Sequence, residues 1–414
     1  MEKKTESEIE RIAKYTSMHR KGVHAFYGFK TKQSYTTAFK CFQKAYELGS
    51  EDALVDIGVC YMRGLGVQKD IEKGSKIITE CYERKLPHAY QAYGRILELG
   101  EGVDRDYEKA LECYIKATEY GEARAFSNVG DMYLHGKGCE RSIPKAIEAF
   151  RKGHRYGDTL SSANLGAIYL KGMFGIEKNY DLAFDYLSRA VSDGNTPSYS
   201  RLAKCYAEGL GCEKDVNKAD ELYSKAYREG DYEGLSGMAE IRKRGEIRAS
   251  PHRIFRMFKE ASEHGIMEAQ YNLGMCYLDG FGTKRSVQEA IYALSKAASQ
   301  YDLRSLKALN RLQLEEQGPS DDLKAKLIIA ARCNDRESME MLWKTESDEK
   351  PPEDLEAWFW KTYGEGFAAM ELPIGVDKKF KTYSFIDGER FRRNVLGPDA
   401  KTKVSIKESD VAYR

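Results

Sequence analysis

The sequence predicts an all-α solenoid built from about eight to nine helix–turn–helix units. Three sets of residues recur in phase along the 414-residue chain. Gly-x-Gly pairs start at residues 64, 100, 136, 209 and 280, and a glycine closes most units. A small residue recurs every 35 to 37 positions, at Gly22, Gly58, Gly94, Gly130, Gly166, Ala203, Ala239 and Gly274. A steady period of this length is typical of solenoids, in which each unit packs on its neighbours.

One unit, residues 122–157, shows how the parts fold. Val129 and Gly130 lie on the apolar side of a predicted first helix, and the glycine lets a neighbouring helix approach closely. The Gly-x-Gly pair ends this helix, because glycine adopts positive φ at little cost. A second predicted helix then turns Ala146 and Phe150 inward. Each unit is therefore expected to be a pair of helices joined by a glycine turn.

The best-preserved copies of the unit identify a family. Residues 272–298 contain NLGMCYLDGFG followed by EAIYALSKAA, and residues 92–121 read AYGRILELGEGVDRDYEKALECYIKATEYG. These segments resemble the Sel1-like repeat, a relative of the tetratricopeptide repeat, over roughly residues 14–300. The resemblance implies a right-handed superhelix of antiparallel helix pairs with a concave inner surface. It also implies a scaffold that binds proteins, and no chemistry.

Composition divides the chain into four predicted segments. Residues 1–13 form an N-terminal cap, 14–300 the eight-unit solenoid, and 301–346 a degenerate terminal repeat with a capping helix. Residues 347–414 comprise a linker, an aromatic-rich helix and a C-terminal tail. Within this tail Asp387-Gly388 favours a β-hairpin.

Charge and cysteine usage limit the location and the partners. Lys and Arg number 66 against 65 Asp and Glu, which argues against a dedicated nucleic-acid binder. The charged start lacks the apolar run of a signal peptide, and no stretch is long enough to span a membrane. Nine cysteines show no pair that repeats in every unit, which favours free thiols. We therefore expect a cytoplasmic protein.

No pattern in the sequence indicates catalysis, a cofactor or a metal. The Gly-x-Gly pairs follow helices and lack the strand, third glycine or Gly-Lys-Ser/Thr ending that phosphate binding requires. The seven histidines are dispersed, and no His-Glu-x-x-His, Cys-x-x-Cys or Gly-x-Ser-x-Gly motif occurs. We expect a protein that is not an enzyme, with no catalytic, cofactor-binding or metal-binding residue.

The concave face is the predicted partner site. If the unit packs like a tetratricopeptide repeat, the first-helix positions opposite the small-residue stripe face inward. These positions are Gln91, Arg95, Arg124, Asp131, His135, Lys171, Lys204, Glu208, Glu240, Lys243, Tyr271 and Asp279. Phe174, in the longer turn 172–175, and the aromatic pair Trp358 and Trp360 are further candidates for partner contact.

The main interpretation is therefore a non-enzymatic adaptor that holds a protein or peptide partner, with the tail adding to the binding or regulating it. A second interpretation places an enzymatic activity in residues 351–414, with the solenoid as substrate receptor. A third uses residues 242–259, where seven basic residues accompany one acid, Glu246, to bind an acidic or phosphorylated ligand or nucleic acid. The same stretch can also be read as a long turn whose charges face water.

Overall fold

The computed structural model describes residues 6–28, 31–300, 302–318, 323–324, 327–328, 331, 336–347 and 349–363. Every regular element within these ranges is a helix, and none of them is a strand. The all-α fold that the repeats predict is therefore confirmed. The hairpin predicted around Asp387-Gly388 and the tail beyond residue 363 lie outside the described residues.

The chain divides into two compact units, Met1–Lys171 with Asp185–Asn195, and Gly172–Phe184 with Thr196–Arg414. Helix α10, Tyr180–Ser192, crosses the division. The other helices of unit 1 are α1 Glu6–Tyr27, α2 Tyr35–Glu47, α3 Asp52–Arg63, α4 Ile71–Glu83, α5 Ala89–Leu99, α6 Tyr107–Glu119, α7 Ala123–His135, α8 Ile143–Arg155 and α9 Thr159–Lys171. Those described in unit 2 are α11 Thr196–Glu208, α12 Val216–Arg228, α13 Tyr232–Lys243, α14 Pro251–Glu263, α15 Met267–Asp279, α16 Val287–Ser299, α17 Leu303–Gln317, α19 Arg336–Glu346 and α20 Leu355–Tyr363.

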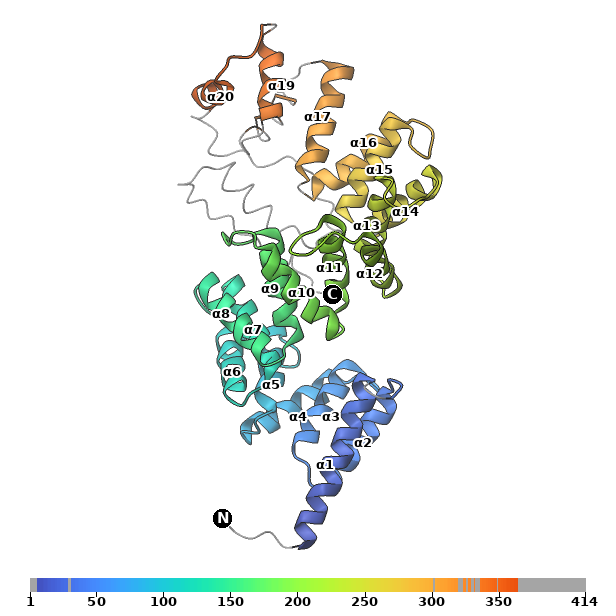
Figure 1. Cartoon of the computed structure of the whole chain (residues 1–414). Coiled ribbons are helices and arrows are strands. Elements are labelled where there is room, and N and C mark those ends of the chain that lie inside the picture. The colour runs from blue at the N-terminus through green and yellow to red at the C-terminus, as the bar shows by residue number, and fades with distance from the viewer. Residues whose placement is uncertain are drawn as a thin grey trace. The chain divides into compact units, whose positions relative to one another are not determined.

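Within each unit, consecutive helices pair side by side, as α3 with α4 and α11 with α12 show (Figure 1). The first helices of successive pairs also contact one another directly: α3 meets α5, α7 meets α9, and α11 meets α13. We call the surface that the odd-numbered helices share within one unit the first-helix wall of that unit. Side chains from several repeats can therefore act together along this wall.

The central small residue of each first helix lets the second helix of the same pair pack closely. A Cβ on Gly130 would lie only 2.3 Å from the ring of Phe150, which is completely buried. The same relation joins Gly58 with Ile78, Gly94 with Tyr114, Gly166 with Leu187, and Gly274 with Leu294. The predicted role of these glycines is thus confirmed, and their cost to helix stability, about 1 kcal/mol each, is offset by burial of a large side chain.

The Gly-x-Gly turns set how one pair stacks on the preceding pair. Gly64 ends α3 in the left-handed conformation, with φ of 68°. A Cβ on the second glycine, Gly66, would lie 2.2 Å from the backbone oxygen of Tyr35 at the start of α2. The side chain of Asp70 then caps α4 by accepting a hydrogen bond from the Lys73 amide. These pairs therefore make turns, as the sequence predicts.

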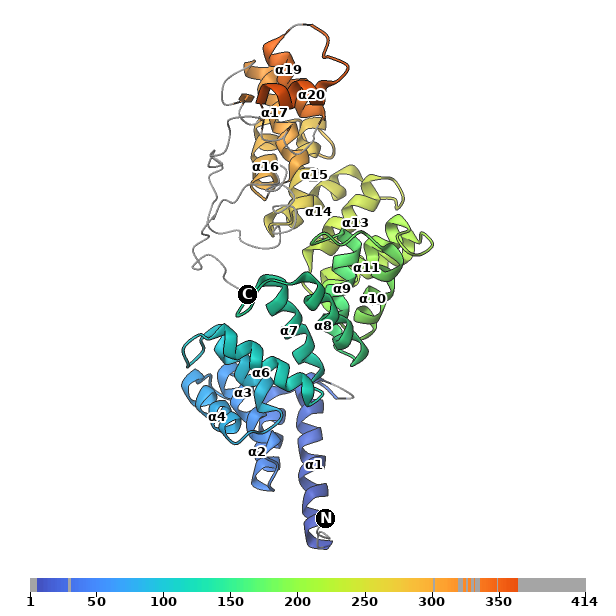
Figure 2. The same ribbon diagram turned by 90° about the vertical axis from the view of Figure 1, so that its left-hand side faces the viewer.

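The two ends of the described chain depart from the regular pair. Helix α1 runs for 22 residues, and Figures 1 and 2 show its N-terminal turns extending past α2. Near the other end, Phe359 of α20 is completely buried in a cluster with Leu342 of α19. The aromatic helix thus packs against the helix before it. The four-segment division of the sequence stays a prediction.

Candidate functional site

The twelve residues predicted for the partner site all lie on first helices, and none is fully buried. Whether their side chains face a concave surface stays a prediction. Six of the side chains are exposed: Arg124, His135, Lys171, Lys204, Glu208 and Asp279. The other six are half-buried: Gln91, Arg95, Asp131, Glu240, Lys243 and Tyr271.

Three arginines from successive repeats lie on first helices of unit 1. We call Arg63 on α3, Arg95 on α5 and Arg124 on α7 the arginine stripe. Loss of surrounding water lowers the pKa of Arg63, and repulsion from Arg95 and Arg124 lowers it further. The charges of Arg95 and Arg124, from the next two repeats, therefore both reach Arg63. Arg63 belongs to the second repeat, just outside the repeats from which the candidates were chosen, and sequence reasoning missed it.

The arginine stripe has no ion-pair partner among the described residues. The acid three positions after Arg95 on α5 is Glu98, and its carboxylate is already engaged. Tyr114 donates to one oxygen of Glu98 at 2.9 Å, and Lys137 pairs with the other at 3.0 Å. Glu101 only partly offsets the repulsion at Arg63. Like charges on one surface repel one another, and an anionic ligand bound there would relieve this repulsion.

A second group of titratable side chains lies next to Glu98. Burial, and then the negative charge of Glu98, raise the pKa of Asp131 to about 7. Its carboxylate accepts a hydrogen bond from Asn164 at 3.4 Å. Burial also lowers the pKa of His135, with Lys137 adding to the effect. Asp131 is therefore the carboxyl of unit 1 whose charge changes near neutral pH.

Unit 2 carries acids at the same three repeat positions. Arg63 lies five residues after Gly58, the central small residue of its repeat. Arg95 lies one residue after Gly94, and Arg124 lies six residues before Gly130. In unit 2 these positions are Glu208, Glu240 and Glu268, which we call the glutamate stripe. Burial raises the pKa of Glu240, and Glu268 and Glu208 contribute to the increase. Glu268 was also missed, and aligning the repeats position by position would have found it.

The charges of the glutamate stripe are largely compensated within the solenoid. Arg304 of α17 donates to both oxygens of Glu268, each at 2.9 Å. Lys204 lies 3.9 Å from Glu208, one helical turn away. Lys204 and Arg244 also oppose the increase in the pKa of Glu240. Two further candidates of unit 2 also make contacts within the solenoid: the ring of Tyr271 lies 4.5 Å from the Arg304 guanidinium, and Lys243 donates to Asn272 at 3.3 Å.

The basic stretch 242–259 is divided among a helix end, a turn and the start of the next helix. Arg242 donates to both oxygens of Asp220, at 2.6 and 3.0 Å, and is mostly buried. Arg244 pairs with Glu246 at 3.3 Å. Pro251 is the first residue of α14, so the stretch is split between a first helix, a turn and a second helix. Of its five other basic residues Lys243 is half-buried, and the four exposed ones are Arg248, Arg253, Arg256 and Lys259.

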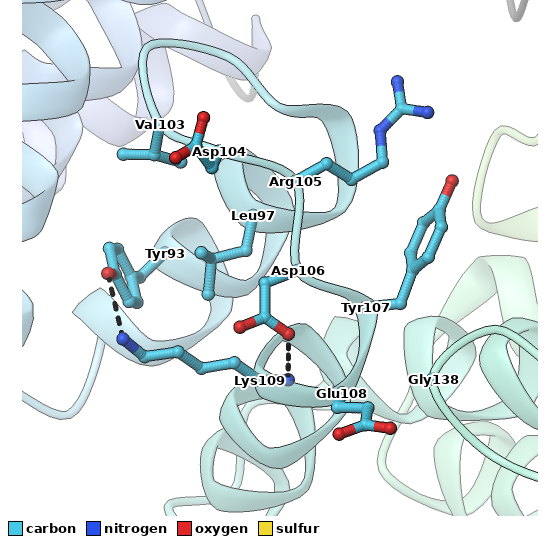
Figure 3. A pocket seen from close by; sticks show the side chains of 10 residues that line it. All are labelled: Tyr93, Leu97, Val103, Asp104, Arg105, Asp106, Tyr107, Glu108, Lys109 and Gly138. Carbon is cyan, nitrogen blue, oxygen red and sulfur yellow. Dashed lines mark hydrogen bonds between the residues drawn. The ribbon is translucent and has the colours of Figure 1, made fainter.

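An open pocket of about 590 Å³ lies at the turn between α5 and α6 (Figure 3). Its polar side chains have structural partners: Asp106 caps α6 by accepting from the Lys109 amide at 2.9 Å, and the Lys109 ammonium lies 3.5 Å from the Tyr93 hydroxyl. Figure 3 shows the side chain of Arg105 extending away from Asp106 and Lys109. Side-chain caps of this kind recur at the other second helices, so the pocket belongs to the repeat architecture.

The aromatic candidates lie apart from the first-helix wall. Phe174, in the turn after α9, adopts a positive φ of 58°, and its side chain is half-buried. The ring of Trp358 packs edge-on against Trp343, with ring centres 4.9 Å apart. The side chain of Trp360 lies outside what the structure describes. No contact in the structure tests these three residues as partner contacts.

The described cysteines are eight free thiols, five of them buried. Burial raises the pKa of Cys60 to about 12 and those of Cys81 and Cys113 to about 11, which disfavours the reactive thiolate. Within the described part of the chain, no group of three or more His, Cys, Asp or Glu side chains is placed to hold a metal ion. None of the helices in that part is long and apolar enough to cross a membrane.

The Sel1 repeat family model matches seven segments, 17–50, 51–74, 87–121, 124–152, 160–195, 196–231 and 268–302, which together make up more than half of the chain. The chain belongs to the Sel1 repeat family. Between the last two segments lies the pair α13 and α14, which the family model passes over. The structure nevertheless packs these two helices as a pair.

Two solved structures and one curated protein are similar to this chain. The antigen c5321 of uropathogenic Escherichia coli, an SLR fold, aligns with a TM-score of 0.55 and 23% identity over 87% of this chain and 79% of that chain. A Sel1 repeat protein from Oxalobacter formigenes has a TM-score of 0.52 and 25% identity, over 59% and 96%. Chitin synthase regulatory factor 3 of Schizosaccharomyces pombe is 26% identical, over 31% of this chain and 19% of that protein. The chain thus spans about a fifth of the length of this curated relative.

Proposed function

We propose that this chain is a non-enzymatic scaffold that binds a protein or peptide partner along a concave face lined by its first helices. Sel1 repeat and related solenoids generally mediate protein–protein interaction and are generally non-catalytic. The observation that carries the proposal is the arginine stripe, three charged side chains on one wall without an ion-pair partner among the described residues. The C-terminal tail adds to this binding or regulates it.

The distribution of charge supports a partner on the first-helix wall. Arg242, where most repeats have tyrosine, is mostly buried and held by Asp220. Arg63 and Arg124 are exposed, and neither has an ion pair with any residue that the structure describes. Arginine is enriched among the few residues that dominate protein interfaces. The similarity to a chitin synthase regulatory factor also agrees with a role carried out on another protein.

Two exposed pairs on the wall and a matched control test the proposal. The first variant carries Arg124→Glu with Lys171→Glu, the second carries Lys204→Glu with Glu208→Lys, and all four positions are exposed. The control reverses three exposed basic residues on second helices: Lys40→Glu, Lys76→Glu and Arg155→Glu. Each full-length chain is used to capture proteins from native cell extract, and captured proteins are quantified by mass spectrometry.

We expect at least one wall variant to lose a captured partner by tenfold or more, while the control changes its capture by less than twofold. A purified partner should then reproduce the difference in a direct binding measurement. If both wall variants retain every protein that the wild-type chain and the control retain, the first-helix wall is not the partner site. A further variant, Trp358→Ala, measures the contribution of the aromatic helix in the same assay.

A further inference from the structure

We infer that the arginine stripe of unit 1 is a binding site for an acidic protein segment, a short run of chain with several Asp or Glu side chains. The inference rests on the proposed function and specifies the chemistry of the partner. It concerns Arg63, Arg95 and Arg124, which lie at exposed or half-buried positions on three successive first helices. The charges of Arg95 and Arg124 both reach Arg63.

The first step is that these arginines do not contribute to the fold through ion pairs. Glu98 uses both carboxylate oxygens on Tyr114 and Lys137. In the chain without a partner, Arg63 therefore carries repulsion from Arg95 and Arg124 that Glu101 only partly offsets. Carboxylates placed against the guanidinium groups would replace this repulsion with charge-assisted hydrogen bonds, which are often bidentate and shorter than neutral ones.

The spacing of the stripe suits an extended segment. Packed helices lie about 8–10 Å apart. In the extended polyproline II conformation a chain advances about 3.1 Å per residue and completes one turn in three residues, so side chains three positions apart point the same way and span about one repeat. A segment with an acidic side chain at about every third position can therefore offer one carboxylate to each arginine. The stripe is three repeats long, which limits the segment to about seven to ten residues.

The surrounding charges favour a carboxylate segment over a long polyanion. Glu101 lies near Arg63, and Glu98 and Asp131 follow along the same wall. A nucleic-acid backbone carries a charge at every nucleotide, so it would place phosphates against these acids as well as against the arginines. A short segment with separated acids can avoid them. The balanced charge of the whole chain, 66 basic against 65 acidic residues, agrees with this choice.

The test uses the full chain and a defined probe. The probe is a fluorescein-labelled peptide of twelve residues with glutamate at every third position and glycine or serine elsewhere. Matched probes carry glutamine in place of glutamate, or four contiguous glutamates, and a twelve-nucleotide single-stranded DNA serves as the polyanion. Binding is measured by fluorescence anisotropy at 0.15 M and 0.5 M salt, where charge-dependent binding should weaken several-fold.

We expect the spaced glutamate peptide to bind at least tenfold more tightly than its glutamine counterpart. The variant Arg63→Gln with Arg95→Gln and Arg124→Gln should lose at least tenfold in affinity for it. The triple lysine variant at these positions should lose less, about two- to fivefold, because it keeps the charge and loses the bidentate geometry. The second-helix control, Lys40→Glu with Lys76→Glu and Arg155→Glu, should remain within twofold of wild type. Far-ultraviolet circular dichroism verifies that each variant is folded.

Three results would overturn the inference: equal binding of the glutamate and glutamine peptides, tighter binding of the DNA, or unchanged affinity in the folded glutamine variant. They would leave the proposed function standing if the exposed wall variants still lost a captured protein. The opposite combination is also distinguishable. If the glutamate peptide binds through the arginines but the wall variants still capture every partner, the acidic chemistry is supported and the proposed function is removed.

Discussion

The arginine stripe of unit 1 and the glutamate stripe of unit 2 occupy the same three repeat positions but differ in how their charges are compensated. Glu268 is held by a bidentate contact with Arg304, and Glu208 has Lys204 nearby. Arg63 and Arg124 have no such partner among the described residues. The same repeat positions can therefore carry charges that are paired within the solenoid or charges that are left for a ligand. Each prediction below would break this comparison or sharpen it.

The largest expected effect is from Gly130→Asp, which should remove the arginine stripe while sparing the glutamate stripe. The new side chain would meet the ring of Phe150 and bury a charge, at a cost of about 3 kcal/mol or more. Because solenoid stability is nearly additive between neighbours, α7 and its neighbours should open before α13 and α15. Hydrogen exchange resolved by helix measures this.

The control for that change is Gly121→Asn, which has open space around it and a left-handed conformation that asparagine tolerates. It should cost less than about 1 kcal/mol. Uniform loss of protection in both units after Gly130→Asp would show that the two stripes are not on separable parts of the solenoid.

The second prediction compares an arginine that has a partner with one that does not. Arg242→Ala should destabilise unit 2 by about 2–3 kcal/mol, because Asp220 would lose both hydrogen bonds in a partly buried setting. Arg63→Ala should change the free energy of unfolding by less than about 0.5 kcal/mol. Urea unfolding of each variant measures both. Equal costs would mean that Arg63 has a structural role and is not reserved for a ligand.

The third prediction concerns a position that the two units share. Asp131 and Glu240 each follow the central small residue of their repeat, and burial raises the pKa of both carboxyl groups. With a raised folded-state pKa, the native protein binds more protons than the unfolded chain between about pH 4 and pH 7. Folding stability from Asp131 therefore falls as pH rises through that window.

Asp131→Asn should remove this penalty. It is expected to stabilise the protein by about 1–2 kcal/mol above pH 7 and to have little effect at pH 4. Glu240→Gln should act in the same direction. The difference in unfolding midpoint between variant and wild type, followed from pH 4 to pH 8, checks the sign. A gain that is larger at pH 4 than at pH 8 would contradict the assignment.

The smallest expected effect is from Arg304→Ala, which would leave the glutamate stripe with less compensation and so make it more like the arginine stripe. Both partners are partly exposed, so the loss should be at most about 1 kcal/mol. It should appear as faster hydrogen exchange near the start of α17, with α11 unchanged. Faster exchange throughout unit 2 would show that the contact supports more than one interface.

The sequence predicted the local parts of this fold well because each part follows from a short-range rule. Gly64 and Gly66 mark a turn since few other residues adopt positive φ cheaply, and the structure places both there. Gly130 marks a close helix contact, and Phe150 fills it. The twelve candidate residues were also placed correctly on first helices, since helical periodicity alone assigns a residue to its element.

The sequence by itself determined the solenoid, its family and the helix on which each candidate lies. Only the tertiary structure decided which charges are compensated. Arg304 reaches Glu268 from another repeat, and Arg242 finds Asp220 22 residues away, while Arg63, Arg95 and Arg124 have no counter-ion among the described residues. The physical reason is that periodicity fixes where a side chain starts on its helix, whereas an ion pair depends on distances between helices that no local pattern encodes.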